Sequence, residues 1–138
     1  ARMLDRARKR ADSLGRSVAL QGADIEALPF KDAVFDTVTA TCVFCSVGDP
    51  VWGLEEVRRV VKPDGRVLLM EHVRPENPVM GKLFDLLTPV IRRVLGPEIN
   101  RRTVANVRRA GLETVSVRRE GICREIEAKP ARNGARAV

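Results

Sequence analysis

Apolar and polar positions alternate with two different periods along the 138-residue chain. Apolar residues that recur every three or four positions predict amphipathic helices at 3–14, 50–61, 80–95 and 100–110. Short apolar or alternating runs predict strands at 18–20, 34–41, 66–73, 112–119 and 121–128. The last two runs are separated by one tight turn, which predicts an antiparallel hairpin. Helices that alternate with buried strands indicate an α/β fold.

Glycine, proline and short polar residues set the boundaries of these elements. We expect Gly15 to end the first helix and Asp49-Pro50 to begin the second. The run Lys62–Gly65 predicts a turn between the second helix and the strand that follows it. Residues 1–128 are expected to form one partial domain, and residues 129–138 a flexible tail.

Composition and charge narrow the range of partners. The chain is 44% hydrophobic but only 4% aromatic, which is typical of a helix-covered parallel sheet rich in Val, Ile and Leu. Its formal net charge is +7, yet the arginine pairs are spread over successive elements without neighbouring aromatic residues. This pattern favours solvated helix faces over nucleic-acid binding. No apolar run is long enough to span a bilayer, and three cysteines without a secretory signal indicate a cytoplasmic protein.

The stretch 22–40, GADIEALPFKDAVFDTVTA, carries the first chemical signal. Its acidic residue Asp24 directly follows an apolar strand, and ligands of open parallel sheets bind outside the carboxyl ends of strands. This stretch and residues 54–72, LEEVRRVVKPDGRVLLMEH, resemble the class I S-adenosylmethionine-dependent methyltransferases. The most similar branch contains the quinone-biosynthesis C-methyltransferases and the phosphatidylethanolamine N-methyltransferases. The resemblance covers roughly residues 3–128.

The resemblance implies a Rossmann-like methyltransferase sheet with strand order 3-2-1-4-5-7-6 and a C-terminal antiparallel hairpin. Set against this family, the chain begins in the helix after the second strand, so the first two strands and the Gly-rich cofactor turn are absent from it. The 18–20 strand then has no neighbour, and the 34–41 strand has a free edge. We expect an oligomer to cover that edge. A segment supplied by another chain, or direct pairing of 18–20 with 34–41, are the alternatives.

S-adenosylmethionine is the cofactor that the resemblance implies, and its contacts fall on Asp24, Ile25, Thr41 and Cys42. Asp24 would accept a hydrogen bond from the adenine amino group, with the backbone of Ile25 against the ring. A plain Asx turn is the alternative interpretation of Asp24. Thr41 and Cys42 end the 34–41 strand, beside the methionine portion of the cofactor.

Further candidates end the next strand, at the same edge of the sheet. His72 is the candidate catalytic residue, because an imidazole that titrates near neutral pH can accept a proton from an incoming nucleophile. The alternative is a histidine that only caps the strand. Cys45, Glu71 and Arg74 are candidate substrate contacts, with Arg74 steering an anionic group or pairing with Glu71. The C-x-x-C spacing of Cys42 and Cys45 lacks a second pair, so we expect no metal.

The sequence therefore predicts S-adenosylmethionine-dependent methyl transfer to a small, lipophilic acceptor by the intact protein, with low or no activity of this chain by itself. The alternative is a degenerate methyltransferase-like module that binds no cofactor and serves oligomeric interactions. The expected partners are a small-molecule acceptor and further copies of the chain, without nucleic acid and without a transmembrane segment. The apolar face of 80–95 leaves a peripheral membrane contact open, although core packing is favoured.

Overall fold

The computed structural model describes residues 2–72, 86, 103–120 and 123–131. Its elements are α1 (Arg2–Ser13), β1 (Phe35–Thr41), α2 (Pro50–Val60), β2 (Val61–His72), α4 (Thr103–Arg109), β3 (Leu112–Glu120) and β4 (Cys123–Pro130). Most of the predicted elements in this part of the chain are confirmed, and the predicted helix at 80–95 lies outside the described residues apart from position 86. None of the helices described here is long and apolar enough to cross a membrane.

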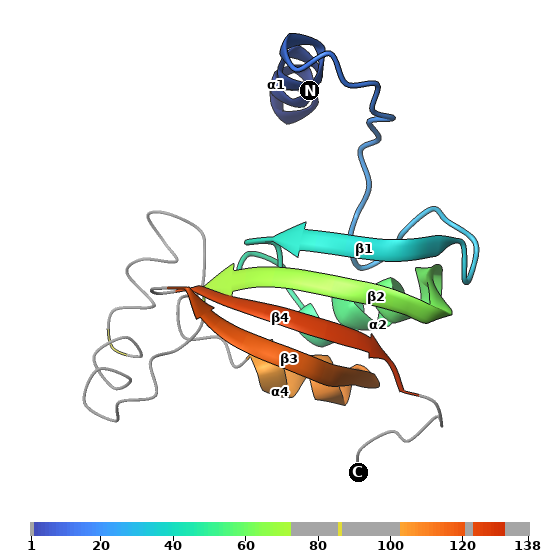
Figure 1. The fold of residues 1–138 in the computed structure, drawn as a ribbon, viewed down its shortest axis with the longest axis vertical. Coiled ribbons are helices and arrows are strands. Elements are labelled where there is room, and N and C mark those ends of the chain that lie inside the picture. Colours follow the sequence, from blue (N-terminus) through green and yellow to red (C-terminus); the bar gives the residue numbers. More distant parts are fainter. Residues whose placement is uncertain (1, 73–85, 87–102, 121–122, 132–138) are drawn as a thin grey trace.

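The strands form one mixed sheet in the order β1-β2-β4-β3 (Figure 1). β1 and β2 are parallel, whereas β4 is antiparallel to both β2 and β3. This order corresponds to strands 4-5-7-6 of the sheet implied by the sequence, so the α/β fold class and the C-terminal hairpin are confirmed. Because β1 and β2 are parallel, their carboxyl ends meet at one edge of the sheet.

The predicted strand at 18–20 is wrong. These residues have no regular secondary structure, the side chain of Val18 is 56% exposed, and the segment runs as a connection between α1 and the sheet (Figure 1). An apolar run becomes a strand only when a neighbour completes its hydrogen bonds. Within the described residues β1 pairs only with β2, so direct pairing of 18–20 with β1 does not occur. α1 likewise has no buried residue.

The turn predicted at Lys62–Gly65 is also wrong, because these residues lie within β2. Phe35 of β1 pairs with Val61 and Thr37 pairs with Arg66, so β2 carries extra residues in an irregular stretch of the ladder. Gly65 makes this possible. A Cβ atom at Gly65 would lie 2.8 Å from the carbonyl oxygen of Asp36 and 2.7 Å from a methyl carbon of Val61.

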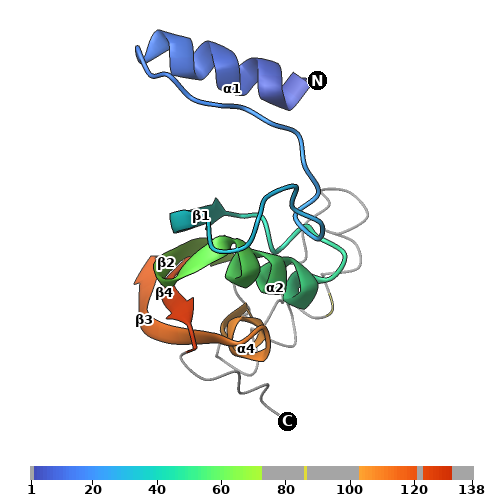
Figure 2. The ribbon, with the colours of Figure 1, turned by 90° about the vertical axis from the view of Figure 1, so that its right-hand side faces the viewer.

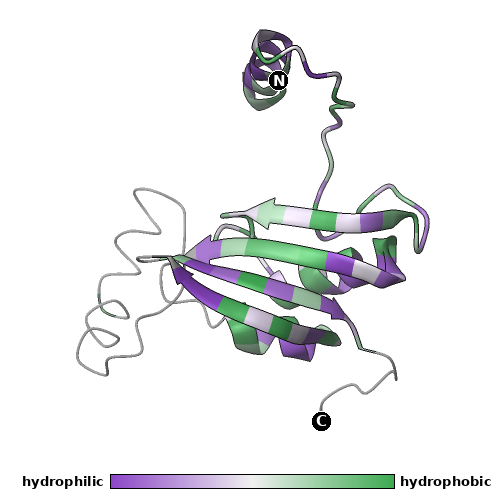
Figure 3. Ribbon diagram, in the orientation of Figure 1, coloured by the Kyte–Doolittle hydropathy of each residue, from purple (hydrophilic) through white to green (hydrophobic). Residues whose placement is uncertain are grey.

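α2 and α4 cover one face of the sheet (Figures 1 and 2). The core between them is aliphatic and contains one aromatic ring; it consists of Phe44, Leu54, Val57, Val61, Val67, Leu69, Val107, Ala110, Leu112, Ile126 and Ala128. Apolar and polar residues are interspersed along the strands (Figure 3). β4 runs to Pro130, and the Ala131 amide donates to the Gly111 carbonyl oxygen at 3.1 Å, so regular structure continues past residue 128.

The contact at Gly65 predicts a sharp stability effect. Gly65→Ala should lower the free energy of unfolding by about 1–3 kcal/mol, because the new methyl group overlaps backbone atoms that cannot move independently. Denaturant titration followed by circular dichroism measures this loss. The control is Gly22→Ala, whose Cβ would lie 3.7 Å from Leu4, an ordinary contact, and whose effect should stay within about 0.5 kcal/mol. Equal stability of the two variants would contradict the proposed close approach.

Candidate functional site

The candidate site lies at the carboxyl edge of β1 and β2, where three segments meet. The turn after β1 and the segment around Ile25 both approach Gly53 of α2. A Cβ atom built at Gly53 would lie 3.2 Å from the Phe44 side chain and 3.5 Å from the Ile25 side chain. Glu26 ties this segment to the start of α2, because its carboxylate accepts the Asp49 amide at 2.8 Å. The residues expected from the sequence at 24–25, 41–45 and 71–72 therefore share one edge.

Glu71 is fully buried near the end of β2. Its Oε1 accepts hydrogen bonds from the amides of Val43 at 2.8 Å and Phe44 at 3.0 Å, and its Oε2 accepts the amide of Cys45 at 3.2 Å. Hydrogen bonds of this kind offset the cost of removing a carboxylate from water. Both carboxylate oxygens are thus engaged by backbone, and the contact with substrate expected for Glu71 stays a prediction.

Two thiols flank this turn. The Cys42 amide donates to the Met70 carbonyl oxygen at 2.8 Å, and Cys42 has a φ of 53°, in the left-handed region. The Cys45 thiol donates to the Cys42 carbonyl oxygen at 3.4 Å. Burial is the main cause that raises the pKa of both thiols, and the negative charge of Glu71 raises each pKa further. Both groups are therefore protonated at neutral pH and are poor nucleophiles, which fits a lining role.

Asp24 is exposed, and its Oδ1 accepts the Glu26 amide at 3.0 Å while its own carbonyl oxygen accepts the Ala27 amide at 3.1 Å. The Asx turn that the sequence left open as the alternative interpretation of Asp24 is therefore present. It also holds an exposed carboxylate in a fixed position beside Ile25. An acceptor-only group suits an exocyclic amine, so the residues present fit the adenine end of S-adenosylmethionine.

The remaining predicted site residues are placed less fully. Thr41 is the exposed last residue of β1. His72 is the last residue of β2, where its backbone pairs with Cys123, and the structure does not describe its side chain. Arg74 lies outside the described residues. The general-base role of His72 and the steering role of Arg74 stay predictions.

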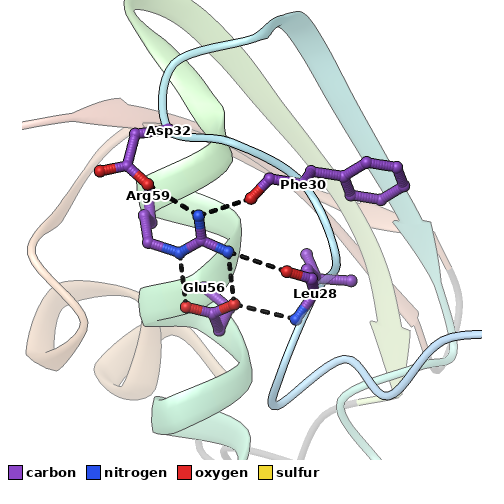
Figure 4. Close-up of polar contacts among 5 residues, drawn as sticks. All are labelled: Leu28, Phe30, Asp32, Glu56 and Arg59. Atoms are coloured by element: carbon purple, nitrogen blue, oxygen red, sulfur yellow. Dashed lines mark hydrogen bonds and ion pairs between the residues drawn. The ribbon is translucent and has the colours of Figure 1, made fainter.

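Glu56 and Arg59 of α2 hold a neighbouring loop through a network of hydrogen bonds, called the Glu56–Arg59 clamp below (Figure 4). This network was not predicted from the sequence. Arg59 donates to Glu56 through Nε and Nη2, both at 2.7 Å, and to the Leu28 carbonyl oxygen at 3.0 Å. Its Nη1 donates to the Phe30 carbonyl oxygen and to Asp32, both at 2.7 Å.

Glu56 completes this clamp by accepting the Leu28 amide at 2.9 Å. Together the two side chains fix residues 28–32, which connect the Asp24 turn to β1. Arg58 and Arg59 form one of the arginine pairs for which the sequence favoured solvated helix faces. That interpretation is wrong for Arg59, because its side chain is only 30% exposed and donates to Glu56, Asp32 and two backbone carbonyl oxygens. The E-x-x-R spacing was the available signal, because it places the two side chains on one face of a helix.

In sequence, the chain is similar to known methyltransferases. A model of the methyltransferase domain family matches residues 1–69, half of the chain. The chain is 38% identical over 84 residues to the demethylmenaquinone methyltransferase of Deinococcus radiodurans, covering 61% of this chain and 35% of that protein. It is 32% identical over 96 residues to the ubiquinone/menaquinone biosynthesis C-methyltransferase UbiE of Bdellovibrio bacteriovorus, covering 70% and 41% respectively.

Among solved structures, the YcgJ protein from Bacillus subtilis superposes with a TM-score of 0.74 at 19% identity, over 96% of this chain and 80% of that one. This likeness shows the fold. The family model, together with this fold, identifies a class I methyltransferase domain. The chain belongs to the methyltransferase domain family. It spans about a third to two fifths of the length of the two curated relatives described above.

The clamp in Figure 4 predicts a pH-dependent stability difference. Arg59→Lys should lower the melting temperature at pH 7, because a single ammonium group cannot reproduce the guanidinium fork. The hydrogen bond from Arg59 is the main cause that holds the pKa of Glu56 below its usual range. The stabilisation is therefore complete above the unfolded pKa of about 4.3 and is lost as the pH falls through the lower folded value.

Melting curves of both proteins between pH 7 and pH 3 measure this difference, which should narrow as the pH falls. The matched control is Arg58→Lys, at the exposed neighbouring position. Its melting temperature should equal that of the unchanged chain at every pH. A gap between Arg59→Lys and the unchanged chain that keeps its size down to pH 3 would rule out Glu56 as the partner that matters.

Proposed function

We propose that this chain forms the cofactor- and acceptor-binding edge of an S-adenosylmethionine-dependent methyltransferase that acts on a small, lipophilic acceptor of the quinone type. The observation that carries the proposal is the convergence at one sheet edge of the exposed Asp24 carboxylate and the turn that follows Cys42. Membership of the family and the names of the curated relatives, which act in menaquinone and ubiquinone biosynthesis, support it. Methyl transfer belongs to the intact protein, and we expect low or no activity from this chain by itself.

When bound, S-adenosylmethionine supplies an electrophilic methyl group on a sulfonium. The task of the protein is chiefly to orient the donor and the acceptor in line. Asp24 would accept a hydrogen bond from the adenine amino group, and the backbone of Ile25 would face the ring. Thr41, the last residue of β1, and Cys42, which follows it, would hold the methionine portion of the cofactor.

On the acceptor side, the proposal assigns proton removal to His72, the last residue of β2. Removal of the proton from a hydroxyl group of a quinol-like acceptor makes that oxygen, and the ring carbon conjugated with it, a better nucleophile. If the ring carbon takes the methyl group, its own proton leaves afterwards and the aromatic ring is restored. Cys45 contributes a protonated, apolar lining and no covalent chemistry. Arg74 follows shortly after β2 in sequence and would attract an anionic group of the acceptor.

An oligomeric interaction module is the second candidate, and the edge of β1 favours it. Within the described residues β1 has one partner strand, and α1 buries no side chain. An unpaired edge and an unpartnered amphipathic helix are surfaces that other chains can cover. This candidate predicts self-association without affinity for S-adenosylmethionine.

Calorimetric titration of S-adenosylmethionine into the 138-residue chain tests the proposed function. We expect saturable binding that weakens at least about tenfold in Asp24→Asn, because the amide keeps the size of the side chain and loses an acceptor oxygen and the charge. The matched control is Asp64→Asn, an exposed aspartate at the opposite end of β2, which should bind as the unchanged chain does.

The mass of the same sample in solution, measured by light scattering, separates the two candidates. A folded oligomer that takes up no S-adenosylmethionine at millimolar concentration would overturn the methyltransferase proposal for this chain and support the interaction module. Equal weakening by Asp24→Asn and Asp64→Asn would reject the specific role of Asp24.

A further inference from the structure

We propose that Glu71 is a positioning residue of this site, one that fixes the backbone of the turn after β1 and thereby sets the conformation of Cys42. The observation is that its buried carboxylate accepts three consecutive backbone amides, those of Val43, Phe44 and Cys45. The inference rests on the proposed function for its consequence, since Thr41 and Cys42 are the residues assigned there to the cofactor.

Three consecutive amides that point at one centre form a concave anion-binding backbone arrangement. Here the anion is a side chain from the neighbouring strand, 26 to 28 residues further along the sequence. Both oxygens are needed, since Oε1 takes the Val43 and Phe44 amides and Oε2 takes the Cys45 amide. Burying a carboxylate is costly, and an apolar side chain would fill the same space at lower cost. A role in holding the turn explains why the charge is there.

The conformation of Cys42 shows the effect of the three hydrogen bonds that Glu71 accepts, called the Glu71 clamp below. A residue with a side chain is disfavoured in the left-handed region that its φ of 53° occupies, and it persists there only where the surroundings determine it. β2 supplies those surroundings at two consecutive positions. The Met70 carbonyl oxygen accepts the Cys42 amide at 2.8 Å, and Glu71 accepts the next amide along the chain, also at 2.8 Å. The end of β2 therefore determines how the chain leaves β1.

In this arrangement Glu71 has a different role from the direct substrate contact that the sequence predicted for it. Its two oxygens already hold backbone amides, so Glu71 acts on ligands through the turn. Loosening the clamp should release Cys42 from its left-handed conformation. Ligand affinity should then fall even though the fold and the Asp24 turn stay intact.

The test compares Glu71→Gln with Leu69→Val. Glutamine keeps the volume of the side chain, but its amide nitrogen cannot accept the Cys45 amide that Oε2 accepts in the native chain. Leu69 is the preceding inward-facing residue of β2 and is buried in the core, so its truncation lowers global stability but removes none of the hydrogen bonds between Glu71 and the turn. Glu71→Asp, which keeps the charge but withdraws the oxygens by one methylene, provides the same comparison if the glutamine variant does not fold.

Two readouts are measured on each variant. The first is the rate at which iodoacetamide alkylates Cys45, resolved from Cys42 and Cys123 by tandem mass spectrometry; Cys45 is buried, so its alkylation reports opening of the turn. The second is the dissociation constant for S-adenosylmethionine. We expect Glu71→Gln to raise the alkylation rate at least about fivefold and to weaken binding about tenfold, because a buried amide loses its acceptor. Leu69→Val should change neither value more than about twofold.

If Glu71→Gln and Leu69→Val alter both readouts equally, Glu71 only stabilises the fold and the proposal is overturned. Faster alkylation in Glu71→Gln with unchanged affinity would also overturn it, because the turn would then not act on the ligand. If the unchanged chain binds no S-adenosylmethionine, the proposed function fails. In that case the alkylation comparison still decides whether Glu71 holds the turn.

Discussion

A carboxylate that accepts backbone amides from another segment is the interaction on which this sheet edge depends. It occurs three times in the described residues. Glu26 holds the Asp49 amide, Glu56 holds the Leu28 amide, and Glu71 holds the turn after β1. Each glutamate ties a connection to an element that is distant in sequence. We expect these contacts to order the described loops of this edge before any ligand binds.

The three clamps differ in burial, which decides what each contributes. Glu71 is fully buried, and the three amides that it accepts stabilise its negative charge. Glu56 is paired with the guanidinium of Arg59. The hydrogen bond between them lowers the pKa of Glu56 and raises the pKa of Arg59. Glu26 is partly exposed and joins the Asp24 turn to the first residues of α2. Together they connect the sheet, α2 and the candidate site.

Local pattern was enough to predict the helices and the hairpin in the described part of the chain. α1 and α2 follow from helical spacing with clear stop and start residues, such as Gly15 and Asp49. The strand predicted at 18–20 failed because a strand depends on a partner, which composition cannot reveal. The turn predicted at Lys62–Gly65 failed because these residues are the extra residues of an irregular stretch within β2, between the Val61 and Arg66 pairs with β1.

The candidate site could be predicted in position but only partly in role. Glu71 was identified because ligands of parallel sheets bind at strand ends. Asp24 was identified by the same reasoning, but the 18–20 strand on which it rested does not form; contacts of Ile25 and Glu26 with α2 and its N-cap hold that segment instead. That Glu71 holds backbone amides 26 to 28 residues away could not be predicted, since no local pattern encodes that contact. For Glu56 and Arg59, the E-x-x-R spacing could have indicated the ion pair within α2, but their backbone partners lie 28 to 31 residues away and no local pattern indicates those.

Amide hydrogen exchange on the unchanged chain, followed residue by residue by nuclear magnetic resonance, tests the preformed edge most directly. The account predicts that the amides of Leu28, Val43, Phe44 and Cys45 exchange at least about a hundredfold more slowly than those of an unstructured peptide, without any ligand. Exchange of these amides at unstructured rates, while the amide of Leu69 in the core of β2 stays protected, would contradict it.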